Sequence, residues 1–207
     1  MTLLTLADLP MRSSIWPNLR EPDRALDGDI TLADLTGVGL QHLRGAEGAL
    51  RAALGDLPGE TGEVLPVEGG LAARLTDDEW MLITPDRADA RGLADTSSLV
   101  TVTDVSHGYG VLLLAGPRAP KVLAKLCALD FSESAFPDLH AAQTSLANVR
   151  ALVLRRDHHD RRAYLIAVGR SVTEYVWELL LDGAEEFEPA LADGASLIRS
   201  LVKGTRE

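Results

Sequence analysis

The chain has 207 residues, with 20 lysines and arginines against 31 aspartates and glutamates, so its formal charge is −11. An acidic surface repels phosphate backbones, and three residues each of Trp, Tyr and Phe are few for stacking bases, so we expect no nucleic-acid partner. The single cysteine, Cys127, excludes a disulfide within the chain and a cysteine-rich metal site.

The N-terminal residues predict an irregular arm over residues 1–30. Three prolines, Pro10, Pro17 and Pro22, are spread through this segment, a pattern typical of loops. Trp16 lies in the arm, where it either packs on the parent domain or anchors the chain to a partner. The first apolar residues follow no basic residue, and no run approaches the ~20 apolar residues of a membrane span, so we expect a cytoplasmic protein without membrane contact.

The first half of the chain predicts a strand-like run, a helix and three further strands. Residues 34–40 (DLTGVGL) hold a Gly-x-Gly turn, and apolar residues have helical spacing from Ala49 to Leu54. Extended segments follow at 63–67, 71–75 and 79–84. A short helix is predicted after Pro85.

The second half repeats this order. Residues 104–111 (DVSHGYGV) again hold a Gly-x-Gly turn, and an amphipathic helix over 122–127 contains Cys127 as a small core residue. Extended segments follow at 141–146, 149–155 and 162–168, and the last of these is apolar on both faces, as in a buried central strand. A capping box at residues 171–174 (SVTE) predicts the start of a final helix.

Two copies of the same element order predict an α+β domain built by internal duplication. We expect this domain over residues 31–185, with two related lobes at about 31–100 and 101–185. Residues 186–207 form a C-terminal tail with a helix, on which Leu197, Ile198 and Leu201 make an apolar stripe. The stripe either closes the core or docks on another chain, and with Trp16 it is our candidate partner-binding surface.

Motifs for catalysis, cofactors and metals are not found in the sequence. The two Gly-x-Gly turns lack a third glycine and precede strands rather than helices, so they predict turns and not dinucleotide sites. Residues 157–160 (DHHD) predict a hydrated hairpin loop more readily than a metal site, because adjacent histidines on a strand point in opposite directions. We therefore assign no catalytic, cofactor-binding or metal-binding residue.

Asp104, Ser106 and His107 form the group that most resembles an active site. A Ser–His–Asp triad needs side chains that converge in space, and neighbours in sequence seldom achieve this. Asp104 and Ser106 are expected instead to bond backbone amides at a turn. The repeat favours this structural interpretation, since Asp34 and Thr36 occupy the equivalent positions without a histidine.

Several strings together resemble a known family. Residues 103–108 (TDVSHG), followed by LAGP at 114–117 and an apolar helix, are similar to the aminomethyltransferase-like, folate-binding fold of the glycine cleavage system. The whole pattern over roughly 30–185 resembles more specifically the gamma subunits of heterotetrameric sarcosine oxidases. The further matching strings are GGLAARL at 69–75, DEWML at 78–82, AFP at 135–137, AQTSLA at 142–147 and RSVTEYVWELL at 170–180.

The resemblance implies a non-catalytic, structural subunit of an amine-oxidising complex. Sarcosine oxidases of this type convert sarcosine, or a related N-methyl amino acid, to glycine and hydrogen peroxide, and release formaldehyde or methylene-tetrahydrofolate. The resemblance implies alpha, beta and delta subunits as partners, with FAD, FMN, NAD and tetrahydrofolate on the partners and no cofactor in this chain. The alternative is a free-standing folate-binding or aminomethyltransferase-like protein, for which Asp104 is the only candidate carboxylate.

Overall fold

The computed structural model describes residues 28–85, 87, 100–158 and 160–203. The first half consists of β1 (Thr31–Asp34), β2 (Gly39–Gly45), α1 (Glu47–Leu54), β3 (Val64–Val67), β4 (Gly70–Arg74) and β5 (Glu79–Thr84). Each of the three extended segments predicted here is confirmed to within one residue at either end. The helix predicted after Pro85 lies outside the described residues, apart from Arg87.

The second half is longer. It consists of β6 (Val100–Asp104), the 3-10 turn η3 (Ser106–Gly108), β7 (Tyr109–Ala115), α2 (Ala119–Leu126), β8 (His140–Leu146), β9 (Val149–Arg155), β10 (Ala163–Gly169), α3 (Thr173–Ala184), β11 (Ala190–Asp193) and α4 (Gly194–Lys203). The predicted capping box is wrong, because α3 begins only at Thr173, after the 3-10 turn η4 (Arg170–Val172), and has no side-chain cap. The Thr173 hydroxyl donates instead to the Gly169 carbonyl oxygen at 3.3 Å.

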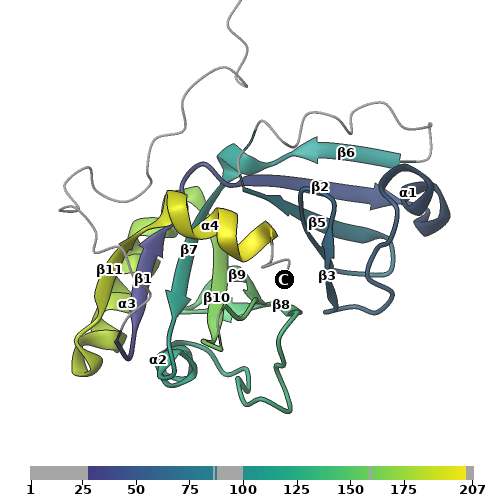
Figure 1. The fold of residues 1–207 in the computed structure, drawn as a ribbon. Coiled ribbons are helices and arrows are strands. Elements are labelled where there is room, and N and C mark those ends of the chain that lie inside the picture. The colour runs from purple at the N-terminus through teal and green to yellow at the C-terminus, as the bar shows by residue number, and fades with distance from the viewer. Residues whose placement is uncertain (1–27, 86, 88–99, 159, 204–207) are drawn as a thin grey trace, which may run out of the picture.

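The strands form two sheets (Figure 1). The five-stranded sheet has the order β3-β4-β5-β2-β6, and the six-stranded sheet has the order β8-β9-β10-β7-β1-β11. The first four strands of each order occupy equivalent places in their halves, so the predicted duplication is present in the structure. The edges β3 and β8 meet, where Val64 N donates to Leu139 O at 2.9 Å and Ala141 N donates to Gly62 O at 2.7 Å.

The fifth strand of each sheet comes from the other half of the chain. Strand β6 pairs with β2 in the five-stranded sheet, and β1 pairs with β7 in the six-stranded sheet, both antiparallel. The boundary expected near residue 100 therefore separates the repeats in sequence but does not separate the sheets. Residues 190–193 also belong to the domain, because β11 pairs in parallel with β1.

Helices α1, α2 and α3 cover the outer faces of the sheets, whereas the inner faces pack on each other and on α4. Alternate residues of β7 show both contacts: Leu112 and Leu114 lie in the cluster with α2 and α3, whereas Leu113 lies in the cluster between the sheets. On the five-stranded sheet, Trp80 packs with Leu50 of α1. Strand β10 is buried on both faces, as predicted for a central strand. None of the helices in the described ranges is long and apolar enough to cross a membrane.

Gly116 allows β1 to enter the six-stranded sheet. This glycine ends β7 with φ +125°, and a Cβ added to it would overlap the carbonyl oxygen of Asp29, just before β1. A positive φ and the absence of a Cβ are both requirements that glycine alone meets without strain.

We expect Gly116→Ala to lower the free energy of unfolding by about 1–3 kcal/mol, because the new methyl group adds strain and pushes β1 away from β7. The control is Gly48→Ala in α1, where a Cβ meets nothing within 4 Å. That change is expected to raise helix stability by up to about 1 kcal/mol. Urea unfolding of both variants checks the difference, and equal midpoints would contradict this account of Gly116.

Candidate functional site

The side chains of Asp104 and Ser106 form hydrogen bonds with backbone groups and are not arranged as reacting groups. The Asp104 carboxylate accepts hydrogen bonds from Ser106 N at 3.0 Å and from Arg87 Nε at 2.8 Å. The Ser106 hydroxyl is buried, accepts from Leu40 N at 2.9 Å and donates to Leu40 O at 3.3 Å. The structural interpretation of these two residues is therefore confirmed. His107 contacts the Arg87 guanidinium.

The environment of Asp104 also favours its charged form. Burial by itself would raise the pKa of this carboxyl, but the hydrogen bonds from Ser106 and the ion pair with Arg87 outweigh it and lower the pKa. A general base needs a pKa near the working pH, so this lowered pKa speaks against proton abstraction by Asp104.

The equivalent turn in the first half has the same construction. Asp34 Oδ1 accepts from Thr36 N at 3.1 Å and from the Thr36 hydroxyl at 2.8 Å. The residue after each aspartate bonds across to the other half: Leu35 N donates to Val111 O at 2.8 Å, and Val105 N donates to Leu40 O at 2.9 Å. Both turns therefore serve the crossing of the chain from one sheet to the other.

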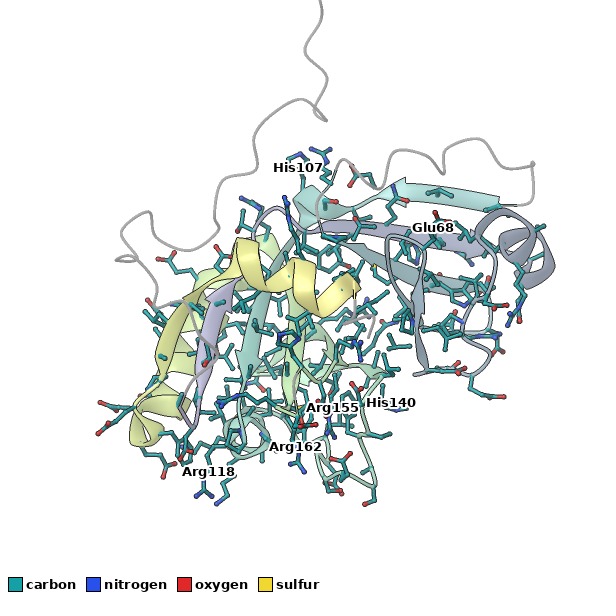
Figure 2. All side chains as sticks on the ribbon, viewed as in Figure 1. Glu68, His107, Arg118, His140, Arg155 and Arg162 are labelled. Atoms are coloured by element: carbon teal, nitrogen blue, oxygen red, sulfur yellow. The ribbon has the colours of Figure 1, made fainter. Side chains whose placement is uncertain are left out.

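Three of the four arginines in residues 155–162 form ion pairs within the chain: Arg155, Arg156 and Arg162. Arg155 is 2 % exposed and binds Asp157 through Nε at 2.9 Å and Nη2 at 2.6 Å, Glu133 at 2.8 Å and the Phe136 carbonyl oxygen at 2.8 Å. Hydrogen bonding by Asp157 raises the pKa of Arg155 further above its ordinary value. Figure 2 shows Arg155 and Arg162 at the same end of the six-stranded sheet, where both contact Glu133.

His158 and Arg161 pair with each other between β9 and β10, where the hairpin loop was predicted. His158 N donates to Arg161 O at 2.9 Å, and Arg161 N donates to His158 O at 3.0 Å. His159 lies outside the described residues. Within the described ranges, no three His, Cys, Asp or Glu side chains converge as a metal ion would require.

The candidate partner-binding residues have different positions in the structure. Ile198 is 3 % exposed and Leu201 is 1 % exposed, and both lie in the cluster between the two sheets. Leu197 is partly buried against the same cluster. Of the two roles left open for the stripe, closing the core therefore accounts for Ile198 and Leu201. Trp16 lies outside the described residues, and its role remains a prediction.

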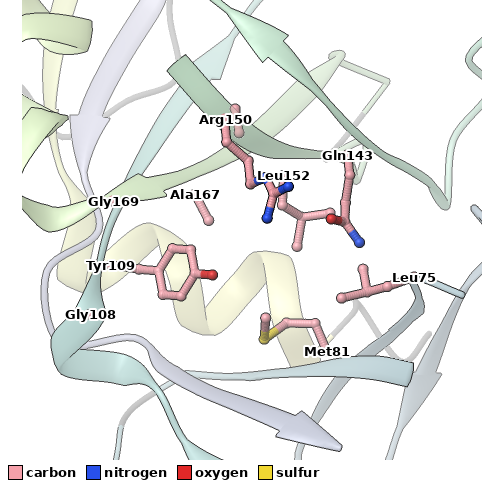
Figure 3. Close-up of a pocket in the computed structure, with 10 residues that line it drawn as sticks. Leu75, Met81, Gly108, Tyr109, Gln143, Arg150, Leu152, Ala167 and Gly169 are labelled. Atoms are coloured by element: carbon pink, nitrogen blue, oxygen red, sulfur yellow. The ribbon is translucent and has the colours of Figure 1, made fainter. Parts of the chain in front are cut away.

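A cavity of about 300 Å³ lies at one end of the core between the sheets (Figure 3). Leu75 and Met81 line it from the five-stranded side, and Tyr109, Gln143, Arg150 and Leu152 line it from the six-stranded side together with small residues. The Tyr109 hydroxyl, the Arg150 guanidinium and the Gln143 amide point into this space (Figure 3). This is a concave, mostly apolar site with a few polar groups, as small-molecule sites are.

Sequence reasoning missed these polar residues. Their signal is weak but present: Arg150 interrupts an apolar run on the strand that continues through Leu152 and Leu154. Because side chains alternate along a strand, Arg150 shares a face with these two leucines, although Arg150 is exposed near the start of β9 and the leucines are buried. Only the pairing of β9 with its neighbours shows what lies opposite that face.

Comparison with known proteins identifies the family. Residues 50–197 match the family model of the GCVT N-terminal domain. The gamma subunit of sarcosine oxidase from an Arthrobacter species is 34% identical over 163 residues, which cover 75% of this chain and 79% of that protein. The chain belongs to the sarcosine oxidase gamma subunit family.

Solved structures agree with the gamma subunit family. A chain of the heterotetrameric sarcosine oxidase from Corynebacterium sp. U-96, in complex with pyrrole 2-carboxylate, is 31% identical with a TM-score of 0.70. The match covers 81% of this chain and 89% of that one. The glycine cleavage aminomethyltransferase from Bartonella henselae has a TM-score of 0.63 at 17% identity, which shows the fold alone, and the match covers 84% of this chain and 50% of the enzyme. The predicted aminomethyltransferase-like fold is confirmed.

The buried Arg155 offers a test of how this family member holds the loop before β8. We expect Arg155→Ala to lower the free energy of unfolding by about 3 kcal/mol, because a buried carbonyl oxygen and two carboxylates lose their partner. The matched control is Arg162→Ala, which removes a second arginine from the same Glu133 but is 35 % exposed, and should cost less than about 1 kcal/mol. Denaturant unfolding of both proteins measures the difference; similar losses would show that burial of Arg155 is unimportant.

Tyr164, next to Arg155 in the sheet, predicts a loss of stability at high pH. Burial raises its pKa to about 12, whereas an unfolded tyrosine titrates at about 10. The folded state therefore keeps this proton longer, and about 2 kcal/mol of stability is lost as pH rises from about 10 to 12. The phenol oxygen has no hydrogen-bond partner in the described part of the chain, so Tyr164→Phe should be at least as stable as wild type at pH 7.

Unfolding free energies at pH 7, 10 and 11.5 for wild type and Tyr164→Phe check this. The gap between the two proteins should widen in favour of the variant as pH rises. Tyr175→Phe is the control, since Tyr175 is 45% exposed. An identical pH dependence in wild type and Tyr164→Phe would contradict the role given to burial.

Proposed function

We propose that this chain is the gamma subunit of a heterotetrameric oxidase that demethylates sarcosine or a related N-methyl amino acid. The observation that carries the proposal is the match to a chain of the heterotetrameric enzyme over 89% of that chain's length at 31% identity. In this role the chain acts with alpha, beta and delta subunits in the cytoplasm, and the complex releases glycine, hydrogen peroxide and formaldehyde or methylene-tetrahydrofolate.

The proposed role of this subunit is structural rather than catalytic. Oxidation of an amine needs an electron acceptor, and this sequence contains no dinucleotide-binding fingerprint. The group that most resembles an active site is used by the fold, because Asp104 and Ser106 both bind backbone amides. As the resemblance to the gamma subunits implies, FAD, FMN, NAD and tetrahydrofolate are carried by the partner subunits in this proposal.

A free-standing folate-binding or aminomethyl-transferring protein is the second candidate. The shared fold favours it, but the Bartonella aminomethyltransferase is 17% identical and this chain covers half of it. Asp104 would have to supply the carboxylate, but its oxygens already bind Ser106 and Arg87. Titration of the full chain with tetrahydrofolate separates the candidates, since millimolar ligand without measurable heat would exclude this second one.

The proposal predicts co-assembly. When the tagged chain is co-expressed with alpha, beta and delta subunits from the same source, we expect one complex with a flavin spectrum that produces peroxide from sarcosine. Omission of this chain should reduce the yield of assembled, active complex, whereas Ser106→Ala should leave the turnover of each assembled complex unchanged. The proposal is wrong if the chain elutes alone while the other three form a fully active enzyme.

A further inference from the structure

We propose that the cavity between the two sheets binds a small molecule that carries a carboxylate on an apolar body, with Arg150 as its anchor. The inference goes beyond the role of a structural subunit, because it gives this chain a ligand of its own. It rests on the strand register, on the partners of the charged side chains and on the lining of the cavity.

The register explains why space is left here. In the six-stranded sheet Ala167 of β10 lies opposite Val111 of β7 and Leu152 of β9. The equivalent residue of the five-stranded sheet is Ile83, which lies opposite Leu40 and Leu71. The duplication thus has a large side chain at this position in one half and a methyl group in the other. A second small residue, Gly169, lies opposite Tyr109 at the same end of β10.

The same register brings the polar groups to this space. Arg150 and Leu152 alternate along β9 on one face, and Gln143 of β8 lies opposite Leu152 on that face. Tyr109 stands two residues before Val111 on β7 and shares its face. The apolar inner face of the six-stranded sheet therefore ends in a phenol, an amide and a guanidinium around residues too small to fill the gap.

Arg150 differs from most of the arginines that the structure describes. Eight arginines form ion pairs with carboxylates of the chain: Arg44, Arg51, Arg74, Arg87, Arg118, Arg155, Arg156 and Arg162. Among the described residues, Arg150 has no such partner, and the cavity lining contains no Asp or Glu. The guanidinium therefore offers its donors to whatever enters.

This arrangement selects the ligand class. A guanidinium binds a planar carboxylate through two parallel hydrogen bonds, and it cannot lose its proton to accommodate a cationic ligand. The Tyr109 hydroxyl and the Gln143 amide can donate to the remaining lone pairs of the carboxylate oxygens. Leu75, Met81 and Leu152 provide an apolar wall, and about 300 Å³ is the lower end of the range for small-molecule sites. A compact aromatic or aliphatic monocarboxylate fits these limits.

The test is binding of 4-fluorobenzoate to the full-length chain, followed by fluorine NMR of the ligand. We expect saturable binding below about 10 mM and at least about tenfold weaker binding to Arg150→Gln. Ala167→Leu, which fills the cavity and leaves Arg150 in place, should also abolish binding. The matched control is Arg118→Gln. Arg118 is an exposed arginine just before α2, it does not line the cavity, and it already pairs with Asp29.

A neutral comparator tests the chemistry. 4-Fluorobenzyl alcohol has the same ring without the charge. Its affinity for wild type should be at least about tenfold lower than that of 4-fluorobenzoate, and Arg150→Gln should not lower it further. Circular dichroism establishes that each variant is folded, and Arg150→Lys replaces Arg150→Gln if the latter is not. The proposal is overturned if wild type shows no saturable binding, if Arg118→Gln weakens binding as much as Arg150→Gln, or if the alcohol binds as tightly as the acid.

Discussion

The exchange of one strand between the two sheets is the constraint on which the rest of the structure depends. Strand β1 begins in the six-stranded sheet and β2 continues in the five-stranded sheet, while β6 and β7 make the reverse crossing. Two equivalent hydrogen bonds fix the crossings, from Leu35 N to Val111 O and from Val105 N to Leu40 O. Because each sheet is incomplete without the other repeat, neither half can bury its own edge, and we expect the domain to unfold as one cooperative unit.

The duplication also repeats a buried arginine beside an aromatic residue. Arg74 lies opposite Trp80 in the five-stranded sheet, and Arg155 lies opposite Tyr164 at the equivalent place in the six-stranded sheet. Each guanidinium reaches back to the loop that precedes the hairpin: Arg74 donates to Gly59 O at 2.6 Å, and Arg155 donates to Phe136 O at 2.8 Å. In both halves an arginine therefore fixes an irregular loop by bonding carbonyl oxygens that strand pairing leaves unused. Arg74 adds a contact over the Trp80 ring at 5.0 Å.

The sequence predicts the elements of this fold better than their connections. Periodicity and turn residues locate β3, β4, β5, β8, β9 and β10 to within a residue, since burial on one or both faces leaves a local pattern. They do not predict β1, β6 or β11, which are short strands of four or five residues. The exchange of strands between the sheets leaves no such pattern, because the residues of β1 and β6 would suit a strand in either sheet. The apolar stripe on α4 likewise predicts that Ile198 and Leu201 are buried. It does not predict that they pack between the inner faces of the two sheets. The cavity depends on the sizes of residues that come together from five strands and the turns beside them. No single segment of the sequence therefore predicts it.

One of the strings that carry the family resemblance, residues 103–108, is part of the crossing itself. Asp104 and Ser106 hold the chain where it leaves the five-stranded sheet and enters the six-stranded one, and Asp34 and Thr36 do the same at the first crossing. A motif with this task is required by the architecture, whatever chemistry the protein performs. The resemblance carried by this string therefore indicates a common fold rather than a common reaction. Within this chain the two repeats differ, among other places, at Ala167 against Ile83 and in the C-terminal β11 and α4, and these differences leave the two crossings unchanged.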